Sequence, residues 1–494
     1  MERAGIALKP QSAASWADIR VTLARGKSKP RPRLTLVHNL VSPLIRCAWE
    51  RHADCHNGVC LSRTVENAVR KSIGRRLAYS LTSVARFEWQ LFLNARQFIV
   101  RANTKENDLW GGFFANGVEE TTIALGELYP ELRRVWVVQI RNWLAFFQKF
   151  YRHSATFAHR MRFEHGASIL GLQCDISDPH RGNSTVIRVR FAGGGTWFYK
   201  PRSAQQTKTW FELLSQLNQN GFSTPFKIPR ILSGREHHWM EQIRGSSCAS
   251  SREERDFWFR SGALLYLVHC LGGVDFHAGN IICERDQPIF VDCETLFHPE
   301  TPLPPEVRTR EKGLFRTGML PFENGSGDNV AGLGPMTVSR VSNRRSAGSS
   351  DLRCHATVEG FESMHRFVGQ KPNGLFDLLG ATGRRGTSRC RILYRPTAHY
   401  HFLLQNSCSP ALLRNTARRS AFLRQSCERP NIKSSIVRRE VAALQDFDIP
   451  FFVERAAHLL KSLSTRDVRD ATRLIARSLS RAQENFDCRL STDQ

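Results

Sequence analysis

Apart from the turn ERDQ and Thr295, five polar side chains stand within the largely apolar stretch GGVDFHAGNIICERDQPIFVDCETLF, residues 272–297. They are Asp275, His277, Asn280, Asp292 and Glu294. Burying a charge without a partner, a metal or a ligand is costly, so this stretch must either face solvent or hold something. Carboxylate and amide oxygens are ligands that Mg²⁺ accepts, and a carboxylate beside a hydroxyl group can take its proton.

The spacing of these residues indicates a nucleotide-dependent phosphoryl-transfer site. Asn280 follows Asp275 by five residues, and the segments NIIC and PIFV predict a hairpin that ends just before Asp292. An Asp, an Asn, a hairpin and a second Asp form the layout of a protein-kinase active site. Such a site also needs an upstream lysine for the phosphates, and Lys200 follows a glycine-rich turn, AGGG. The HRD, DFG and complete GxGxxG motifs of protein kinases are absent.

Five sequence blocks in a fixed order carry a more specific resemblance. Together they resemble the dehydratase domain of class II lanthipeptide synthetases, over a region from about residue 65 to the end of the chain. The blocks are YKPRS (199–203), DFHAGN (275–280), VDCETLFHP (291–299), RTGMLP (316–321) and RILYRPT (391–397).

The resemblance implies a fold, a reaction and cofactors. The expected fold is α+β, with a two-lobed, kinase-like (lipid-kinase-like) catalytic core and large N-terminal and C-terminal helical additions. The expected reaction uses ATP and Mg²⁺ to phosphorylate Ser and Thr of a precursor peptide. Elimination of the phosphate then leaves dehydroalanine or dehydrobutyrine.

The resemblance also assigns roles in the phosphorylation step. Lys200 would bind the phosphates of ATP, and Asp275 would be the general base. Asn280 and Asp292 would hold Mg²⁺. The other members of the same catalytic set are His277 and Glu294.

The elimination step would use two residues of the last block. Arg391 and Thr397 would grip the departing phosphate, whose charge a guanidinium fork stabilises well. The sequence does not identify the base that removes the α-proton. The family usually has a Glu just before the Asn, whereas this chain has Gly279.

Two other interpretations stay open at this point. One is a peptide or small-molecule kinase that phosphorylates without elimination. The other is a non-catalytic basic homologue that binds a peptide or nucleic acid, since 71 Lys and Arg against 45 Asp and Glu give a net charge of +26. The basic residues are scattered rather than clustered, which fits a generally basic enzyme at least as well as a nucleic-acid binder, so the charge alone does not choose between them. Under the resemblance, nucleic acid is not an expected partner.

Hydrophobic periodicity predicts the elements that would position these residues. Five regions are expected. They are a poorly defined basic segment (1–64), a helical accessory region (65–170), a β-rich, N-lobe-like region with Lys200 (171–245), a C-lobe-like catalytic region with long loops at 300–385 (246–440), and a region of C-terminal helices (441–494). The predicted helices are 132–151, 206–221 with a stop at Gly221, 253–273, 451–463 and 468–479. A hairpin is predicted at 185–200, a strand around Trp239, and a strand or strand–helix at 390–404.

Composition sets the expected compartment and partners. Thirteen irregularly spaced cysteines and the absence of a signal-like N-terminus favour reduced thiols in the cytoplasm. No apolar run is long enough for a membrane span. The sequence ends at Gln494 without the zinc-ligand motifs of the family's cyclase domain. We therefore expect a stand-alone dehydratase or a truncated product, with a precursor peptide and, where one exists, a separate lanthionine cyclase as partners.

Overall fold

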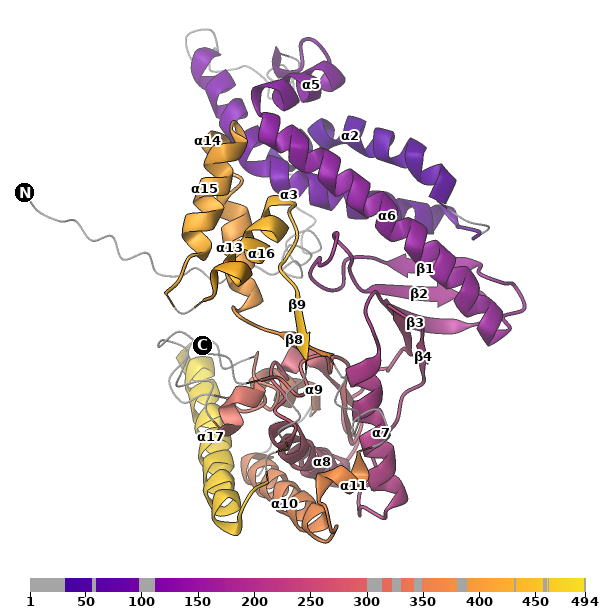
Figure 1. The fold of residues 1–494 in the computed structure, drawn as a ribbon, viewed down its shortest axis with the longest axis vertical. Coiled ribbons are helices and arrows are strands. Elements are labelled where there is room, and N and C mark those ends of the chain that lie inside the picture. Colours follow the sequence, from indigo (N-terminus) through magenta and orange to yellow (C-terminus); the bar gives the residue numbers. More distant parts are fainter. Residues whose placement is uncertain are drawn as a thin grey trace, which may run out of the picture. The chain divides into compact units, whose positions relative to one another are not determined.

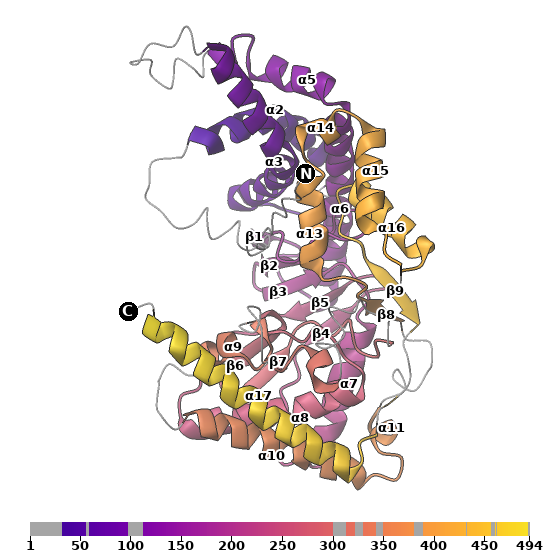
Figure 2. The same cartoon turned by 90° about the vertical axis from the view of Figure 1, so that its left-hand side faces the viewer.

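The computed structural model describes residues 32–55, 59–96, 112–299, 313–321, 330–341, 349–379, 389–430, 432–455, 460 and 462–492. These residues form two compact units. Unit 1 comprises the described residues up to Pro201 and Arg395–Phe451, and unit 2 comprises Arg202–Tyr394 and the described residues from Phe452 onward. Figures 1 and 2 label their helices and strands. Within the described ranges, no helix is both long and apolar enough to span a bilayer.

Unit 1 is mainly helical. The helix α6 (Pro130–Met161) begins with a proline in its first turn, where the missing N–H costs nothing, and ends at the left-handed Arg162 (φ 53°). Its aromatic face is buried, which confirms the helix predicted at 132–151. The remaining helices are α2 (Pro32–His52), α3 (Arg63–Arg96), α5 (Val118–Leu128), α13 (Thr397–Asn406), α14 (Pro410–Leu413), α15 (Thr416–Cys427) and α16 (Ser434–Gln445), with the 3₁₀ turn η1 (Ala53–Cys55).

Three antiparallel strands of unit 1 lead to Lys200. They are β1 (Ile169–Gln173), β2 (Ile187–Phe191) and β3 (Gly195–Lys200), with β2 in the middle. Ile187, Val189 and Phe191 are buried while Arg190 is exposed, so the alternation in the sequence places one face of β2 in the core. The predicted hairpin is confirmed, and Lys200 is the last residue of β3.

Unit 2 carries the other elements. Its helices are α7 (Gln205–Gln219), α8 (Ser251–Cys270), α9 (Pro335–Val341), α10 (Ser349–Gly369), α11 (Leu375–Leu378) and α17 (Thr465–Thr492), with the 3₁₀ turns η2 (Ala278–Asn280) and η3 (Gly313–Thr317). Its strands form three antiparallel pairs: β4 (Ile231–Ser233) with β5 (His238–Glu241), β6 (Ile281–Glu284) with β7 (Gln287–Phe290), and β8 (Arg389–Ile392) with β9 (Phe452–Arg455).

Most element predictions for unit 2 are confirmed. The helices predicted at 206–221, 253–273 and 468–479 are α7, α8 and part of α17, and Gly221 follows α7 with a positive φ of 82°. The strand around Trp239 is β5. The strand–helix alternative at 390–404 is the correct one, since β8 is followed by α13 of unit 1.

Three predictions differ from the structure. Residues 452–455 form a strand rather than a helix, because they pair with β8 from a distant part of the sequence. Residues 349–369, predicted as part of a loop, form the helix α10, whose Phe361 and Met364 are buried. Residues 32–52, within the segment for which no regular element is predicted, form α2. Residues 1–31, 456–459 and much of 300–348 lie outside the described residues.

Two glycines let α8 and α10 approach each other closely. A Cβ atom built on Gly262 of α8 would lie 1.9 Å from the Thr357 carbonyl oxygen of α10. A Cβ atom on Gly360 of α10 would lie 1.9 Å from the Phe259 carbonyl oxygen of α8. Both obstacles are backbone atoms, so a side chain at either position would force the helices apart.

Replacing Gly360 by alanine should therefore lower the free energy of unfolding by at least about 2 kcal/mol, because overpacking against a helix backbone is not relieved by a rotamer change. Gly369→Ala in the same helix is the matched control, since a Cβ there meets nothing within 4 Å. Denaturant titration of both variants should show a loss for Gly360→Ala alone. Equal stabilities would contradict close packing at Gly360.

Candidate active site

The loop after α8 places two polar residues on either side of a buried ring. The Phe276 ring is fully buried, 5.0 Å from the Phe290 ring and 6.3 Å from the Trp210 ring between centroids. Its neighbours remain accessible, with exposed side-chain fractions of 40% for Asp275 and 41% for His277. The aromatic core beneath the loop therefore fixes its path and leaves the two polar groups partly exposed.

The RTGMLP block supports this loop from below. The backbone carbonyl of Thr317 accepts a hydrogen bond from the Phe276 amide at 2.9 Å. A Cβ atom at Gly332, which follows that block, would lie 2.4 Å from the Phe276 carbonyl oxygen. Asp275 itself has a left-handed backbone (φ 66°), an uncommon conformation for a residue with a side chain. Tight backbone packing on both sides of Phe276 therefore helps to hold Asp275 in this conformation.

The β6–β7 ribbon brings three predicted residues to one of its ends. Ile281 pairs with Phe290, and the Val291 amide donates to the Asn280 carbonyl at 2.9 Å, so the residues before β6 and after β7 lie at the same end. The Asn280 side-chain amide donates to the Asp275 carbonyl at 2.9 Å. Asp292 follows directly after Val291. The structure thus gathers Asp275, Asn280 and Asp292 within unit 2.

A chain of ion pairs joins the carboxylates that follow β7 to two arginines. Arg202 Nη2 lies 2.8 Å from Asp292 Oδ2, and Arg202 Nη1 lies 3.1 Å from Glu294 Oε2. The second oxygen of Glu294 lies 2.6 Å from Arg391 Nη1. The Arg391 amide also donates to the Glu294 carbonyl at 2.8 Å. Glu294 therefore holds Arg391, which is 97 residues away in the sequence, through both main chain and side chain.

The charges of this cluster shift the pKa values of its members. Burial alone would lower the pKa values of Arg202 and Arg391, but the adjacent carboxylates outweigh it and both pKa values stand above the ordinary value. Desolvation raises the pKa of the Asp275 carboxyl. His277 and Arg391 act to lower that pKa, whereas Asp292 and Glu294 raise it further. A raised pKa brings a carboxylate closer to the range in which a general base works best.

His277 lies beside Asp275 and caps the short turn η2. Its Nδ1 accepts a hydrogen bond from the Gly279 amide at 3.0 Å, and its Nε2 lies 3.9 Å from Asp275 Oδ1. A Cβ atom on Gly279 would stand 2.7 Å from His277 Cε1. The absence of a side chain at Gly279 therefore leaves room for the observed position of the imidazole.

Two side-chain oxygens at the ribbon end could serve a divalent cation. The amide nitrogen of Asn280 is engaged, which leaves its Oδ1 as the ligating atom, and the Asp292 carboxylate provides the second donor. No group of three or more His, Cys, Asp and Glu suited to a metal is found among the described residues. One or two protein oxygens completed by phosphate and water is the usual coordination of Mg²⁺ at phosphoryl-transfer sites, so the donor set fits this ion.

Lys200 and Thr397 belong to unit 1. Lys200 is buried, with 5% of its surface exposed, and Thr397 is the half-buried first residue of α13. Between Arg391 and Thr397, the block RILYRPT also contains Arg395, whose guanidinium pairs with Glu440 at 2.7 Å inside unit 1. That ion pair is buried, which gives Arg395 a structural role.

Sequence reasoning missed Arg202 as a site residue. It stands two residues after Lys200 in the block YKPRS, so the block itself was the available signal. Its two carboxylate partners lie about 90 positions further along the sequence, and no local pattern connects them to it.

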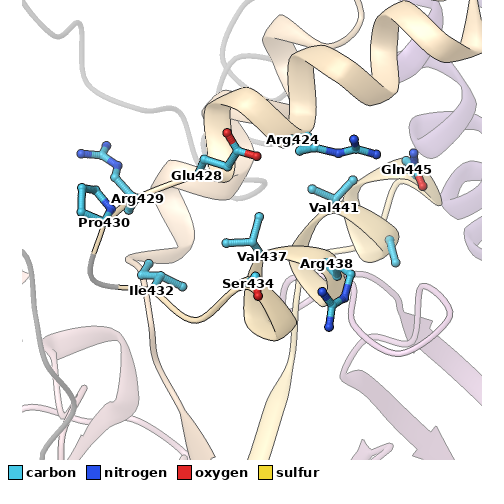
Figure 3. Close-up of a pocket in the computed structure, with 11 residues that line it drawn as sticks. Arg424, Glu428, Arg429, Pro430, Ile432, Ser434, Val437, Arg438, Val441 and Gln445 are labelled. Atoms are coloured by element: carbon cyan, nitrogen blue, oxygen red, sulfur yellow. The ribbon is translucent and has the colours of Figure 1, made fainter.

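A cavity in unit 1 lies between α15 and α16 and has a volume of about 880 Å³ (Figure 3). Its lining includes the apolar side chains of Ile432, Val437 and Val441 together with arginines. None of the predicted site residues lines it.

Comparisons with known proteins agree with the resemblance. Residues 129–351 and 353–455 match the model of a family described as a domain of unknown function, DUF4135. The "Lacticin 481/lactococcin biosynthesis protein LcnDR2" of Lactococcus lactis subsp. lactis is 21% identical over 351 residues, which cover 60% of this chain and 37% of that protein. The chain thus spans well under half the length of that relative. Because the family match extends over more than half of the chain, this protein belongs to the DUF4135 family.

Proposed function

We propose that this protein acts in lanthipeptide biosynthesis as a dehydratase that phosphorylates Ser and Thr of a precursor peptide and then eliminates the phosphate. The similarity to a lacticin 481 biosynthesis protein supports the pathway. The observation that carries the chemistry is the convergence of Asp275, Asn280 and Asp292 at one end of the β6–β7 ribbon. Beside them, Glu294 holds Arg391.

In the phosphorylation step, Asp275 would accept the proton of the peptide hydroxyl as its oxygen bonds to the γ-phosphorus of ATP. Half-exposed and with a raised pKa, this carboxylate suits a general base. His277, 3.9 Å from it, would favour the ionised form when protonated. Asn280 and Asp292 would hold Mg²⁺, which when bound neutralises phosphate charge. Lys200 of unit 1 would bind the phosphates of ATP.

In the elimination step, a base removes the α-proton, the Cβ–O bond breaks, and phosphate leaves. Arg391 would stabilise the charge that develops on the phosphate, because a guanidinium offers two parallel N–H donors. Glu294 occupies one side of Arg391 and would fix its orientation. Thr397 would contribute its hydroxyl to the same phosphate.

The proposal also includes a two-lobed, kinase-like catalytic core. The order of Lys200, Asp275, Asn280, the ribbon and Asp292 along the chain supports it. The substrate would be a precursor peptide, and lanthionine rings would need cyclase activity after dehydration.

Substitution of Asp275 by asparagine should slow phosphorylation by at least about 100-fold, because the amide cannot take the hydroxyl proton. Intact mass spectrometry after incubation with ATP, Mg²⁺ and a precursor peptide should show neither phosphate gain nor water loss. Asp286→Asn, at the opposite end of the same ribbon and paired with Arg260 at 2.9 Å, is the control and should retain activity. An active Asp275→Asn enzyme would remove the general base from the proposal.

Substitution of Arg391 by alanine should let phosphopeptide accumulate, with elimination slowed about 100-fold or more because the leaving phosphate loses its charge partner. The measurement is the ratio of phosphorylated to dehydrated peptide over time. Arg389→Ala on the same strand is the control, since Arg389 is exposed. If the unsubstituted protein itself yields only phosphopeptide, the protein is a kinase without elimination.

The pH dependence of phosphorylation should follow Asp275. The base acts only when ionised, so the rate falls as pH drops through its pKa, which lies above the ordinary value of about 4. Because Arg391 acts to lower that pKa, Arg391→Ala should move the acidic limb of the phosphorylation profile to higher pH. A limb that stays in place, or moves to lower pH, would contradict this coupling.

A further inference from the structure

One guanidinium in unit 2 contacts both carboxylates that follow β7. Arg202 reaches Asp292 at 2.8 Å with one terminal nitrogen and Glu294 at 3.1 Å with the other. The three side chains are mostly buried, with exposed fractions of 15% for Arg202, 24% for Asp292 and 13% for Glu294. Side chains in ion pairs that are this well shielded from solvent must keep a defined arrangement, whereas side chains in exposed pairs can adopt many.

The backbone of Arg202 is itself anchored. Its carbonyl accepts a hydrogen bond from His238 Nδ1 at 2.9 Å. His238 is the first residue of β5 and is fully buried. The guanidinium therefore extends from a fixed point, so it can set the positions of the groups that it contacts.

Glu294 passes this restraint on to Arg391. Its Oε2 lies 3.1 Å from Arg202 Nη1 in an ion pair that is not a hydrogen bond, whereas its Oε1 accepts a hydrogen bond from Arg391. The two arginines thus contact opposite oxygens of one carboxylate. Loss of Arg202 would free one side of Glu294 and allow it to rotate away from Arg391. Asp292 would lose its ion pair at the same time.

We infer that Arg202 is a positioning residue for both half-reactions. Through Asp292 it sets the carboxylate proposed to bind Mg²⁺, and through Glu294 it sets the arginine proposed to bind the departing phosphate. The inference rests on the proposed function. Positioning by Arg202 can be distinguished from an effect of its charge. The positive charge of the guanidinium beside Asp292 would by itself weaken Mg²⁺ binding, whereas holding the Asp292 carboxylate in place strengthens it.

The test compares Arg202→Gln and Arg202→Lys with Arg353→Gln. Arg353 is a suitable control because it is also a buried arginine of unit 2, but it donates to the Leu479 carbonyl at 2.7 Å. Three quantities are measured: the phosphorylation rate, the elimination rate from a synthetic phosphoserine peptide, and the Mg²⁺ concentration for half-maximal phosphorylation. Thermal unfolding of each variant reports folding.

Arg202→Gln should slow both half-reactions by about 10- to 100-fold and raise the half-saturating Mg²⁺ concentration by a similar factor, as loss of an outer-shell partner does at metal sites. Arg202→Lys should recover little, since one ammonium cannot span two carboxylates as a guanidinium fork does. Arg353→Gln should lower the melting temperature without changing the Mg²⁺ requirement.

Three results would overturn the inference. They are full recovery by Arg202→Lys, a lower Mg²⁺ requirement in Arg202→Gln, and loss of only one half-reaction.

Calorimetric titration of the same proteins with Mg²⁺ and a non-hydrolysable ATP analogue separates this inference from the proposed function. Weaker nucleotide-linked Mg²⁺ binding in Arg202→Gln would support positioning of Asp292 even if the unsubstituted protein failed to dehydrate a peptide. An active unsubstituted protein with Arg202 variants that behave like Arg353→Gln would refute the positioning role alone.

Discussion

Compensation of crowded negative charge is the constraint on which the candidate site depends. Two like charges about 4 Å apart repel by about 4 kcal/mol at an effective dielectric constant of about 20. Asp275, Asp292 and Glu294 gather at one end of the ribbon, and the guanidiniums of Arg202 and Arg391 offset two of the three charges. These five groups together keep one net negative charge, a balance that favours a bound cation.

A layer of packed aromatic rings supports this polar cluster. Phe290 of β7 stacks on Trp210 of α7 at 5.3 Å and contacts Phe276 at 5.0 Å. These buried rings fix the strand that leads to Asp292 and the loop that carries Asp275. The charged groups can therefore be held by few hydrogen bonds, since hydrophobic packing has already determined where their backbones run.

Features that depend mainly on residues close together in the sequence could be predicted from it. The alternation in β2, the aromatic spacing in α6 and the order of Asp275, Asn280 and Asp292 are all read within short windows. Two features were not predicted because they depend on residues far away in the sequence. Residues 452–455 have helix-like spacing but form the strand β9 by pairing with β8, and Arg202 contacts its carboxylate partners only in the folded protein. The chemical roles assigned to all the site residues remain predictions, as does the kinase-like core.

The pairing of β8 with β9 has a consequence for biosynthesis. Val453 lies opposite Arg391 in this ladder, and the 57 residues Arg395–Phe451 between the strands belong to unit 1. A ribosome releases the ribbon with Asp275 and Asn280 long before it releases β9. The strand that bears Arg391 therefore stays without its β9 partner while these 57 residues and β9 itself are synthesised. Unit 2 can complete this ladder only once the nascent chain extends beyond Arg455.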